Sequence, residues 1–263
     1  MPPVRYRARV EYDGTDFAGF QVQPGARTVQ GELEAALTRI CGGSQVRVVA
    51  AGRTDAGVHA TGQVIAFTDP GRRTAAELAR AINALLPEDV AIREVMRVPA
   101  GFNPRYAARY REYRYTVWNG PRSPLRERFA LGVRDQLDIA AMERVGSVLV
   151  GRHDFSSFGA AHRQPVRTVH WVRVRRNGSL VTIDVAADAF LRQMVRRIVA
   201  VLLEAGHGKT DEEAVAAALA SGRPAFNGAT APAKGLCLRR VVLGPMRVWT
   251  AAIETNARSN GER

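Results

Sequence analysis

Hydrophobic and polar residues alternate in some stretches of this chain and repeat with helical spacing in others. In the first hundred residues, Thr74 and Glu77 have the spacing of a capping box, in which each side chain bonds the backbone of the other residue at a helix start. The patterns predict strands over residues 5–12, 47–51, 63–67 and 90–98, and helices over residues 29–40 and 74–85.

The second half of the chain repeats this plan loosely. Asn177-Gly178 is typical of a hairpin turn, Asp138 is a candidate N-cap, and a second capping box begins at Thr210. The patterns predict strands over residues 109–118, 166–175, 180–185 and 235–242, and helices over residues 139–149, 190–204 and 210–219. Two comparable halves of strands and helices, with neighbouring strands antiparallel, predict an α+β fold.

The same organisation predicts where the parts of the chain divide. We expect an N-terminal α+β half over residues 1–105 and a C-terminal α+β half over residues 106–248. Residues 249–263 are polar and charged, and we expect them to be a disordered tail.

The composition excludes several classes of protein. No apolar run approaches the roughly 20 residues that a membrane helix needs, and the first ten residues carry charges where a signal peptide would be apolar. Cys41 and Cys237 stand in neither a CxxC nor a zinc-ligand spacing, and the five histidines form no metal-binding pattern. We therefore expect a soluble cytoplasmic protein that binds no metal and makes no membrane contact.

The charge balance favours a polyanionic partner. The chain carries 38 basic and 25 acidic residues, a net charge of +13, and all but two of the basic residues are arginine. Arginine forks to phosphate with two N–H groups and stacks on bases, and neutralising phosphates releases condensed counterions. A codon bias toward arginine accounts for part of this excess, but nucleic acid is the partner that the charge favours most.

One loop concentrates groups that are able to take part in chemistry. Between two predicted strands, residues 52–60 read Gly-Arg-Thr-Asp-Ala-Gly-Val-His-Ala, so that Asp55 lies between glycines with Arg53 and His59 beside it. An isolated sequence of this kind is more often a tight turn whose aspartate bonds its own backbone. The loop does not match the spacings of phosphate-binding loops, and Asp55 would repel an anion. The rest of the chain must decide between these roles.

The strand predicted over residues 109–118 combines aromatic residues with arginines. Alternation places Arg109, Arg111, Tyr113 and Tyr115 on one face, and Tyr110, Glu112 and Arg114 on the other. Such a surface suits stacking on an unpaired base beside its phosphates. An ordinary sheet with aromatic cross-strand pairs fits the same pattern, so both interpretations stay open.

The helix predicted over residues 190–204 has the composition of a buried helix. Phe190, Met194 and Val195 are expected in the core rather than in contact with a ligand. Arg196 would be costly to bury alone, so we expect it to meet a carboxylate or to leave the core.

Taken together, these segments resemble the TruA family of tRNA pseudouridine synthases, and the resemblance runs through nearly the whole chain. The sequence differs mildly from the family at Phe20, where tryptophan is common, and at Asp188, where asparagine is common. The matching blocks, in the family's order, are Glu11–Gly14 with Gly19–Gln21, Ala51–His59 with Thr61–Gln63, Phe102, Arg105, Tyr113–Tyr115, Asp154–Phe158, Ala189-Phe190, Met194–Arg196 and Ala231-Pro232 with Gly235-Leu236.

The resemblance implies roles for four residues. Asp55 matches the catalytic aspartate, and Tyr113 matches the tyrosine that lies against the target base. Arg53 matches the arginine that helps to hold the flipped nucleotide, and Arg196 matches the basic residue that pairs with the aspartate. The family fold resembles two fused ferredoxin-like halves with mainly antiparallel sheets lining a basic central cleft, and its members are homodimers that bind tRNA.

The implied reaction turns uridine into pseudouridine on the 3′ side of the anticodon stem-loop. It moves the sugar bond from N1 to C5 of the base, so it requires no cofactor. Asp55 would either attack C1′ or remove a proton from C2′, and the residues do not decide between these routes. Two other functions fit the same residues: a non-catalytic RNA-binding or chaperone module, and a DNA or RNA glycosidase that cleaves the base without rejoining it.

Overall fold

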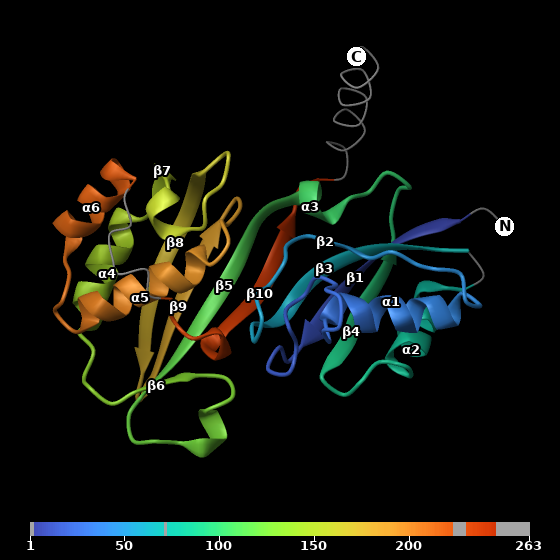
Figure 1. The fold of residues 1–263 in the computed structure, drawn as a ribbon, viewed down its shortest axis with the longest axis horizontal. Helices are drawn as coiled ribbons and strands as arrows, with labels where there is room; N and C mark the ends of the chain where they lie inside the picture. Colours follow the sequence, from blue (N-terminus) through green and yellow to red (C-terminus); the bar gives the residue numbers. More distant parts are fainter. Residues whose placement is uncertain (1–2, 71–72, 223–229, 246–263) are drawn as a thin grey trace, which may run out of the picture. The chain divides into compact units, whose positions relative to one another are not determined.

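The computed structural model describes residues 3–70, 73–222 and 230–245 (Figure 1). The chain divides into two compact units. Unit 1 comprises Met1–Thr54, Ala60–Arg109 and Arg240–Arg263, and unit 2 comprises Asp55–His59 and Tyr110–Arg239. The tail expected over residues 249–263 lies outside the described residues.

Unit 1 is built on β1(Val4–Tyr12), which pairs antiparallel with β3(His59–Asp69) on one side and with β4(Val90–Arg97) on the other. The short β2(Val49–Ala50) pairs with β3. Alternate residues of β1, namely Tyr6, Ala8, Val10 and Tyr12, are buried, as the polar-apolar alternation of the sequence requires. In its described residues the unit also contains the helices α1(Val29–Ile40), α2(Ala75–Asn83) and α3(Pro104–Ala107).

Unit 2 contains the strands β5, β9, β8 and β7 in this order, with the first part of β10, up to Arg239, beside β5. The pairs β5–β9, β9–β8 and β8–β7 are antiparallel, and β6 runs parallel to β5. The strands are β5(Ala108–Asn119), β6(Leu131–Val133), β7(Gly151–Asp154), β8(Val166–Asn177), β9(Leu180–Ala187) and β10(Leu236–Leu243). The helices are α4(Ile139–Val148), α5(Met194–Gly206) and α6(Glu212–Ser221), with single 3-10 turns at η1(Pro124–Arg126), η2(Ser156–Phe158) and η3(Ala233–Gly235).

The core of unit 2 lies on one face of its sheet. Tyr113, Tyr115 and Val117 alternate along β5 and are buried, and their partners across β9 are Val185, Ile183 and Val181. The buried side of α5, which includes Met194, Ile198 and Leu202, is also fully enclosed. Tyr113 therefore lies on the face of β5 that is packed rather than on the face that carries Tyr110 and Arg114.

The predicted α+β class is confirmed, with strands that are mostly antiparallel. The predicted α1 and the capping box of Thr74 and Glu77 are confirmed as well. The strand predicted over residues 47–51 is reduced to two paired residues. No helix in the described part of the chain is long and apolar enough to cross a membrane.

Two helix starts in the second half were predicted wrongly. The helix predicted from Phe190 begins at Met194, because Gln193 has a φ of 63°, a left-handed conformation that cannot continue a helix. The second capping box was placed one residue early: the N-cap of α6 is Asp211, whose side chain accepts a hydrogen bond from the backbone of Ala214.

Candidate active site

Asp55 lies in the loop between β2 and β3, at the start of a tight turn. Its backbone carbonyl accepts a hydrogen bond from the N–H of Val58 at 3.2 Å, and Gly57 supplies the positive φ, 76°, that the turn requires. A Cβ atom at Gly57 would lie 3.2 Å from the Cβ of Ala233, so the turn packs closely on η3. Because the turn uses the backbone of Asp55, the carboxylate is available for other contacts, and its side chain is 32% exposed.

Arg196 lies in the first turn of α5 and brings a cation to this carboxylate. Its Nη1 is 3.8 Å from Oδ2 of Asp55, an ion-pair distance that is too long for a hydrogen bond. Its Nε donates to the carbonyl of Ala231 at 2.7 Å, and its Nη2 donates to Oγ1 of Thr230 at 3.2 Å. The guanidinium is therefore fixed on two sides by neutral oxygens, and Asp55 lies on a third.

Tyr113 lies in the middle of β5, within the same unit. Only 8% of the residue is exposed, and its ring meets the edge of Phe190 at 5.2 Å between centroids, with the two planes at 89°. Burial raises the pKa of the Tyr113 phenol above its ordinary value, the charge of Arg111 opposes this rise, and the charge of Asp55 adds to it. The phenol is therefore neutral at physiological pH and lies within electrostatic reach of Asp55.

Phe190 corrects one expectation from the sequence. It was predicted to be a core residue of a helix, but it is half-buried and precedes α5 in the loop after β9. Met194 and Val195, predicted in the core with it, are buried as expected. The left-handed turn at Gln193 separates Phe190 from the helix and leaves its ring against Tyr113.

Residues 230–235, which we call the connector, contact the loop that carries Asp55, the helix α5 and the strand β5. The connector supports Arg196 through Thr230 and Ala231. The backbone carbonyl of Lys234 accepts a hydrogen bond from Nε2 of His59 at 3.1 Å. The hydroxyl of Tyr115 donates to the carbonyl of Pro232 at 2.9 Å. A Cβ atom at Gly235 would lie 2.7 Å from the Tyr115 ring, so only glycine fits there.

The sequence contained a signal for this segment but not for its role. Ala231-Pro232 and Gly235-Leu236 are among the blocks that carry the family resemblance, yet nothing in their residue types points to the support of an arginine. The sequence analysis also gave no role to Arg111, although alternation placed it on the same face as Tyr113.

Arg53 is the predicted site residue that makes none of these contacts. It belongs to unit 1, its side chain is exposed, and no hydrogen bond or ion pair joins it to another described residue. The next residue, Thr54, is buried and its hydroxyl shares a hydrogen bond with that of Tyr12 at 2.8 Å. The loop is therefore anchored immediately beside Arg53, while Arg53 itself projects to solvent.

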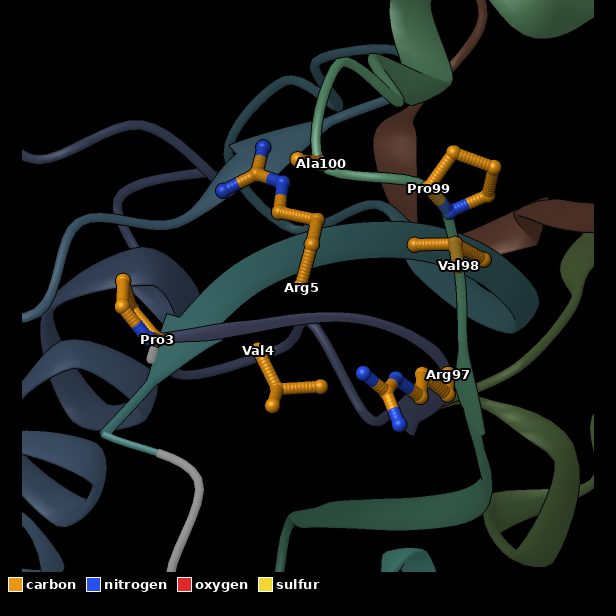
Figure 2. A pocket seen from close by; sticks show the side chains of 7 residues that line it. All are labelled: Pro3, Val4, Arg5, Arg97, Val98, Pro99 and Ala100. Carbon is orange, nitrogen blue, oxygen red and sulfur yellow. The ribbon is translucent and has the colours of Figure 1, made fainter. Parts of the chain in front are cut away.

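A pocket of about 420 Å³ lies elsewhere, at the end of β1 and β4 in unit 1 (Figure 2). Its lining includes Arg5 and Arg97, but Arg97 pairs in register with Tyr6, so the two arginines emerge on opposite faces of the sheet. Figure 2 shows their guanidinium groups on different sides of β1. This pocket therefore does not direct its charges to one point, and none of the four predicted site residues lines it.

The arrangement in unit 2 offers a carboxylate that would suit an enzyme site. A partly exposed aspartate beside a fixed guanidinium and near a buried tyrosine is able to act as a nucleophile or a base. Among the described residues, no group of three or more histidine, cysteine, aspartate or glutamate side chains is placed to hold a metal ion.

Comparison with known proteins identifies the family. Residues 8–107 and 147–242 match the family described as tRNA pseudouridine synthase, and the chain belongs to this family. It is therefore an isomerase that forms pseudouridine.

Several curated relatives cover almost the whole chain. A tRNA pseudouridine synthase A of Moorella thermoacetica is 46% identical over 88% of this chain and 96% of its own. The enzyme of the same name from Syntrophotalea carbinolica is 43% identical over 91% of this chain and 96% of its own. That of Halalkalibacterium halodurans is 42% identical over 97% of this chain and 97% of its own. Among solved structures, an archaeal box H/ACA sRNP Nop10–Cbf5 complex is 13% identical, with a TM-score of 0.36, and the match covers 91% of this chain and 49% of that chain.

Proposed function

We propose that this protein converts uridine to pseudouridine in tRNA, on the 3′ side of the anticodon stem-loop, with Asp55 as its essential catalytic group. The observation that carries the proposal is the contact between the Asp55 carboxylate and the Arg196 guanidinium, at 3.8 Å, near the buried ring of Tyr113. The names of the relatives support tRNA as the substrate.

The reaction breaks the N1–C1′ bond and forms a C5–C1′ bond. In one route the Asp55 carboxylate attacks C1′ as uracil departs; in the other it removes a proton from C2′ and later returns it. In both routes the freed base rotates and C5 bonds to C1′, which in the first route breaks the bond between the Asp55 carboxylate and C1′. The C5 proton then leaves to solvent, and N1 gains a proton. Both routes need an ionised carboxylate.

The other residues have distinct roles in this proposal. Tyr113 stacks against the base, which offsets part of the cost of extruding the nucleotide; stacking contributes roughly 1–3 kcal/mol and extrusion costs a few kcal/mol. Arg196 holds Asp55 in place, and its bonds to Thr230 and Ala231 support a fixed position. Arg53, exposed beside the loop, contacts the backbone of the flipped nucleotide.

The proposal extends to the assembly of the protein. We propose that it acts without a cofactor in the cytoplasm and forms a homodimer. In this proposal each chain has two halves with ferredoxin-like folds, residues 1–105 and 106–248, around a basic central cleft. The excess of arginine supports a basic surface for tRNA. Sedimentation velocity at low protein concentration tests the dimer: a single species with the mass of one chain contradicts it.

A tritium-release assay tests the reaction. Purified protein is incubated with an anticodon stem-loop that carries tritium at C5 of its uridines, and we expect release of tritium to solvent with no free uracil. If no tritium is released while the RNA binds, the non-catalytic RNA-binding function replaces this proposal. Accumulation of free uracil would instead establish a glycosidase.

A further inference from the structure

The hydroxyl of Tyr115 bonds to the connector, and neither the family comparison nor the reaction proposed above gives this residue a role. Tyr115 lies in β5, two residues after Tyr113, and it is fully buried. Its hydroxyl donates a hydrogen bond to the backbone carbonyl of Pro232 at 2.9 Å, within unit 2. A buried tyrosine hydroxyl usually finds a partner, so this bond alone would fit a purely structural role. The contacts on either side of Pro232 favour a second role.

Ala231, which precedes Pro232, bonds to Arg196 through both its N–H and its carbonyl. The N–H donates to the backbone carbonyl of Arg196 at 3.0 Å, and the carbonyl accepts from the Nε of Arg196 at 2.7 Å. One residue of the connector therefore fixes both the backbone and the guanidinium of Arg196. A shift of Ala231 would move the cation that faces Asp55.

Ala233, which follows Pro232, packs against the turn that carries Asp55. A Cβ atom at Gly57, in that turn, would lie 3.2 Å from the Cβ of Ala233. The connector therefore contacts the elements on both sides of the ion pair. Pro232 lies between these two contacts, and it is the residue to which Tyr115 bonds.

The connector is poorly able to absorb a movement of the Pro232 carbonyl. The proline ring fixes φ, here at −52°, so that a movement of this carbonyl is passed to the preceding peptide group instead of being taken up by rotation about N–Cα. At the other end, a Cβ atom at Gly235 would lie 2.7 Å from the Tyr115 ring and 2.9 Å from the carbonyl of Thr116. The ring and the hydroxyl of Tyr115 therefore hold the connector at two points.

We propose that Tyr115 is a positioning residue for the reaction: its hydroxyl holds the connector so that the Arg196 guanidinium stays in place beside the Asp55 carboxylate. This inference rests on the proposed function, because it assumes that this ion pair carries the reaction. Without the hydroxyl, the carbonyl of Pro232 loses its bond, and the peptide groups that fix Arg196 gain freedom. In this role Tyr115 acts through the connector and needs no contact with the substrate.

The first test is Tyr115→Phe, which removes the hydroxyl and keeps the ring against Gly235. We expect single-turnover formation of pseudouridine to fall roughly 3- to 10-fold, the size expected for the loss of one neutral hydrogen bond, with the affinity for tRNA unchanged. Rates are expressed per folded molecule, with the folded fraction measured by circular dichroism in the same buffer. A rate equal to that of the wild type overturns the inference.

Tyr6→Phe is the matched control. Tyr6 is also a buried tyrosine whose hydroxyl donates to a backbone carbonyl, that of Arg73 at 3.0 Å, but it belongs to unit 1. Its rate per folded molecule should follow the wild type. An equal fall in Tyr6→Phe and Tyr115→Phe would attribute the effect to the general loss of a buried hydrogen bond and overturn the inference.

A double-mutant cycle tests whether the hydroxyl acts through Arg196. Arg196→Lys already removes the bond to Ala231, so adding Tyr115→Phe should lower the rate much less in this background than in the wild type. Equal falls in the two backgrounds would show that the hydroxyl acts on something other than Arg196, and the inference would fail.

A measurement on the free protein separates this inference from the proposed function. The Nε–H of Arg196 donates to Ala231, and its signal in heteronuclear NMR spectra is assigned by its loss in Arg196→Lys. Tyr115→Phe should speed the exchange of this proton with water roughly 3- to 10-fold, and Tyr6→Phe should not. Unchanged exchange in Tyr115→Phe overturns the inference even if the wild type turns over. If exchange quickens but the wild type releases no tritium, the proposed reaction fails and the support of Arg196 by the hydroxyl stands.

Discussion

Unit 2 contains two arginine–aspartate pairs that differ in almost every respect. Arg114 meets Asp184 with two hydrogen bonds, at 2.7 and 2.9 Å, whereas Arg196 meets Asp55 at a single distance of 3.8 Å. In the first pair the carboxylate is buried and the guanidinium is the outer partner, with 4% and 35% of the side chains exposed. In the second pair the carboxylate is the more exposed partner: 32% of the Asp55 side chain is exposed, and 17% of the Arg196 side chain.

The difference separates a structural pair from one that suits chemistry. The two bonds from Arg114 occupy both oxygens of Asp184, Arg175 lies 3.9 Å away, and the carboxylate raises the pKa of Arg114. Asp55 forms an ion pair with the guanidinium of Arg196, which is held in place by other groups. The carboxylate of Asp55 therefore stays accessible to a substrate. A loose pair with a partly exposed carboxylate leaves an oxygen accessible to a substrate, and a nucleophile or base must be accessible.

The largest expected effect comes from Asp55→Asn. Removing the carboxylate should lower single-turnover formation of pseudouridine by on the order of 10⁴-fold, because the amide is neither a base nor a nucleophile. The affinity for tRNA should stay within a few fold, and the free energy of unfolding should change by less than about 1 kcal/mol, since the pair is partly exposed. Asp135→Asn, which alters an exposed carboxylate in the same unit, should keep wild-type activity. A parallel loss of binding and rate would make Asp55 structural.

The matching change in the other pair, Asp184→Asn, should act on stability instead. It leaves the Arg114 charge without its partner, and we expect a loss of about 2–3 kcal/mol in the free energy of unfolding, less than for a fully buried pair because Arg114 is a third exposed. Urea denaturation measures this change. The rate per folded molecule should stay near that of the wild type, and a large loss of rate in a stable protein would contradict the structural role.

Arg196→Lys should have an intermediate effect. Lysine keeps the charge but cannot bond Ala231 and Thr230 with a planar fork while facing Asp55, so we expect a roughly 10-fold lower single-turnover rate with the affinity for tRNA unchanged. Arg152→Lys serves as the matched control on an exposed site. A rate for Arg196→Lys equal to that of the wild type would show that charge alone suffices and that the connector bonds do not matter to catalysis.

The smallest effect is expected from Arg53→Gln. An exposed arginine that meets only a phosphate contributes modestly, so the apparent KM for tRNA should rise about 2- to 5-fold with kcat unchanged. Steady-state kinetics at two salt concentrations checks this, and the difference should shrink at higher salt. A fall in kcat at saturating tRNA would place Arg53 in the chemical step, alongside the Asp55–Arg196 pair.

Local signals in the sequence predicted most of the fold. The alternation in β1 and β5, the capping box of α2 and the Asn-Gly turn between β8 and β9 all depend on residues close in the chain. The start of α5 could not be predicted in this way. Its residues fit a helix from Phe190 onward, and only the left-handed backbone at Gln193, a conformation that glycine usually adopts, moves the start to Met194.

The residues of the candidate site could be predicted from the sequence, but the hydrogen bonds that hold them in place could not. The family resemblance pointed to Asp55, Tyr113 and Arg196, and the structure brings these three together in one unit. The bond from Arg111 to Asp188 and the bonds from Arg196 to the connector join segments that are far apart in the sequence. Residue types alone carry no information about such pairings, because any backbone carbonyl is able to accept from any arginine.

Because the connector holds Arg196, the candidate site can assemble only after the ribosome has synthesised residues 230–235. Asp55 and Tyr113 leave the ribosome early, but Thr230 and Ala231, which fix Arg196, follow much later. Contacts between such distant segments form only after the intervening chain has been synthesised and its loops have closed. A nascent or truncated chain that stops before Thr230 would carry Asp55 without the residues that fix its partner Arg196. Under the proposed function, we expect such a chain to be less active than the full chain.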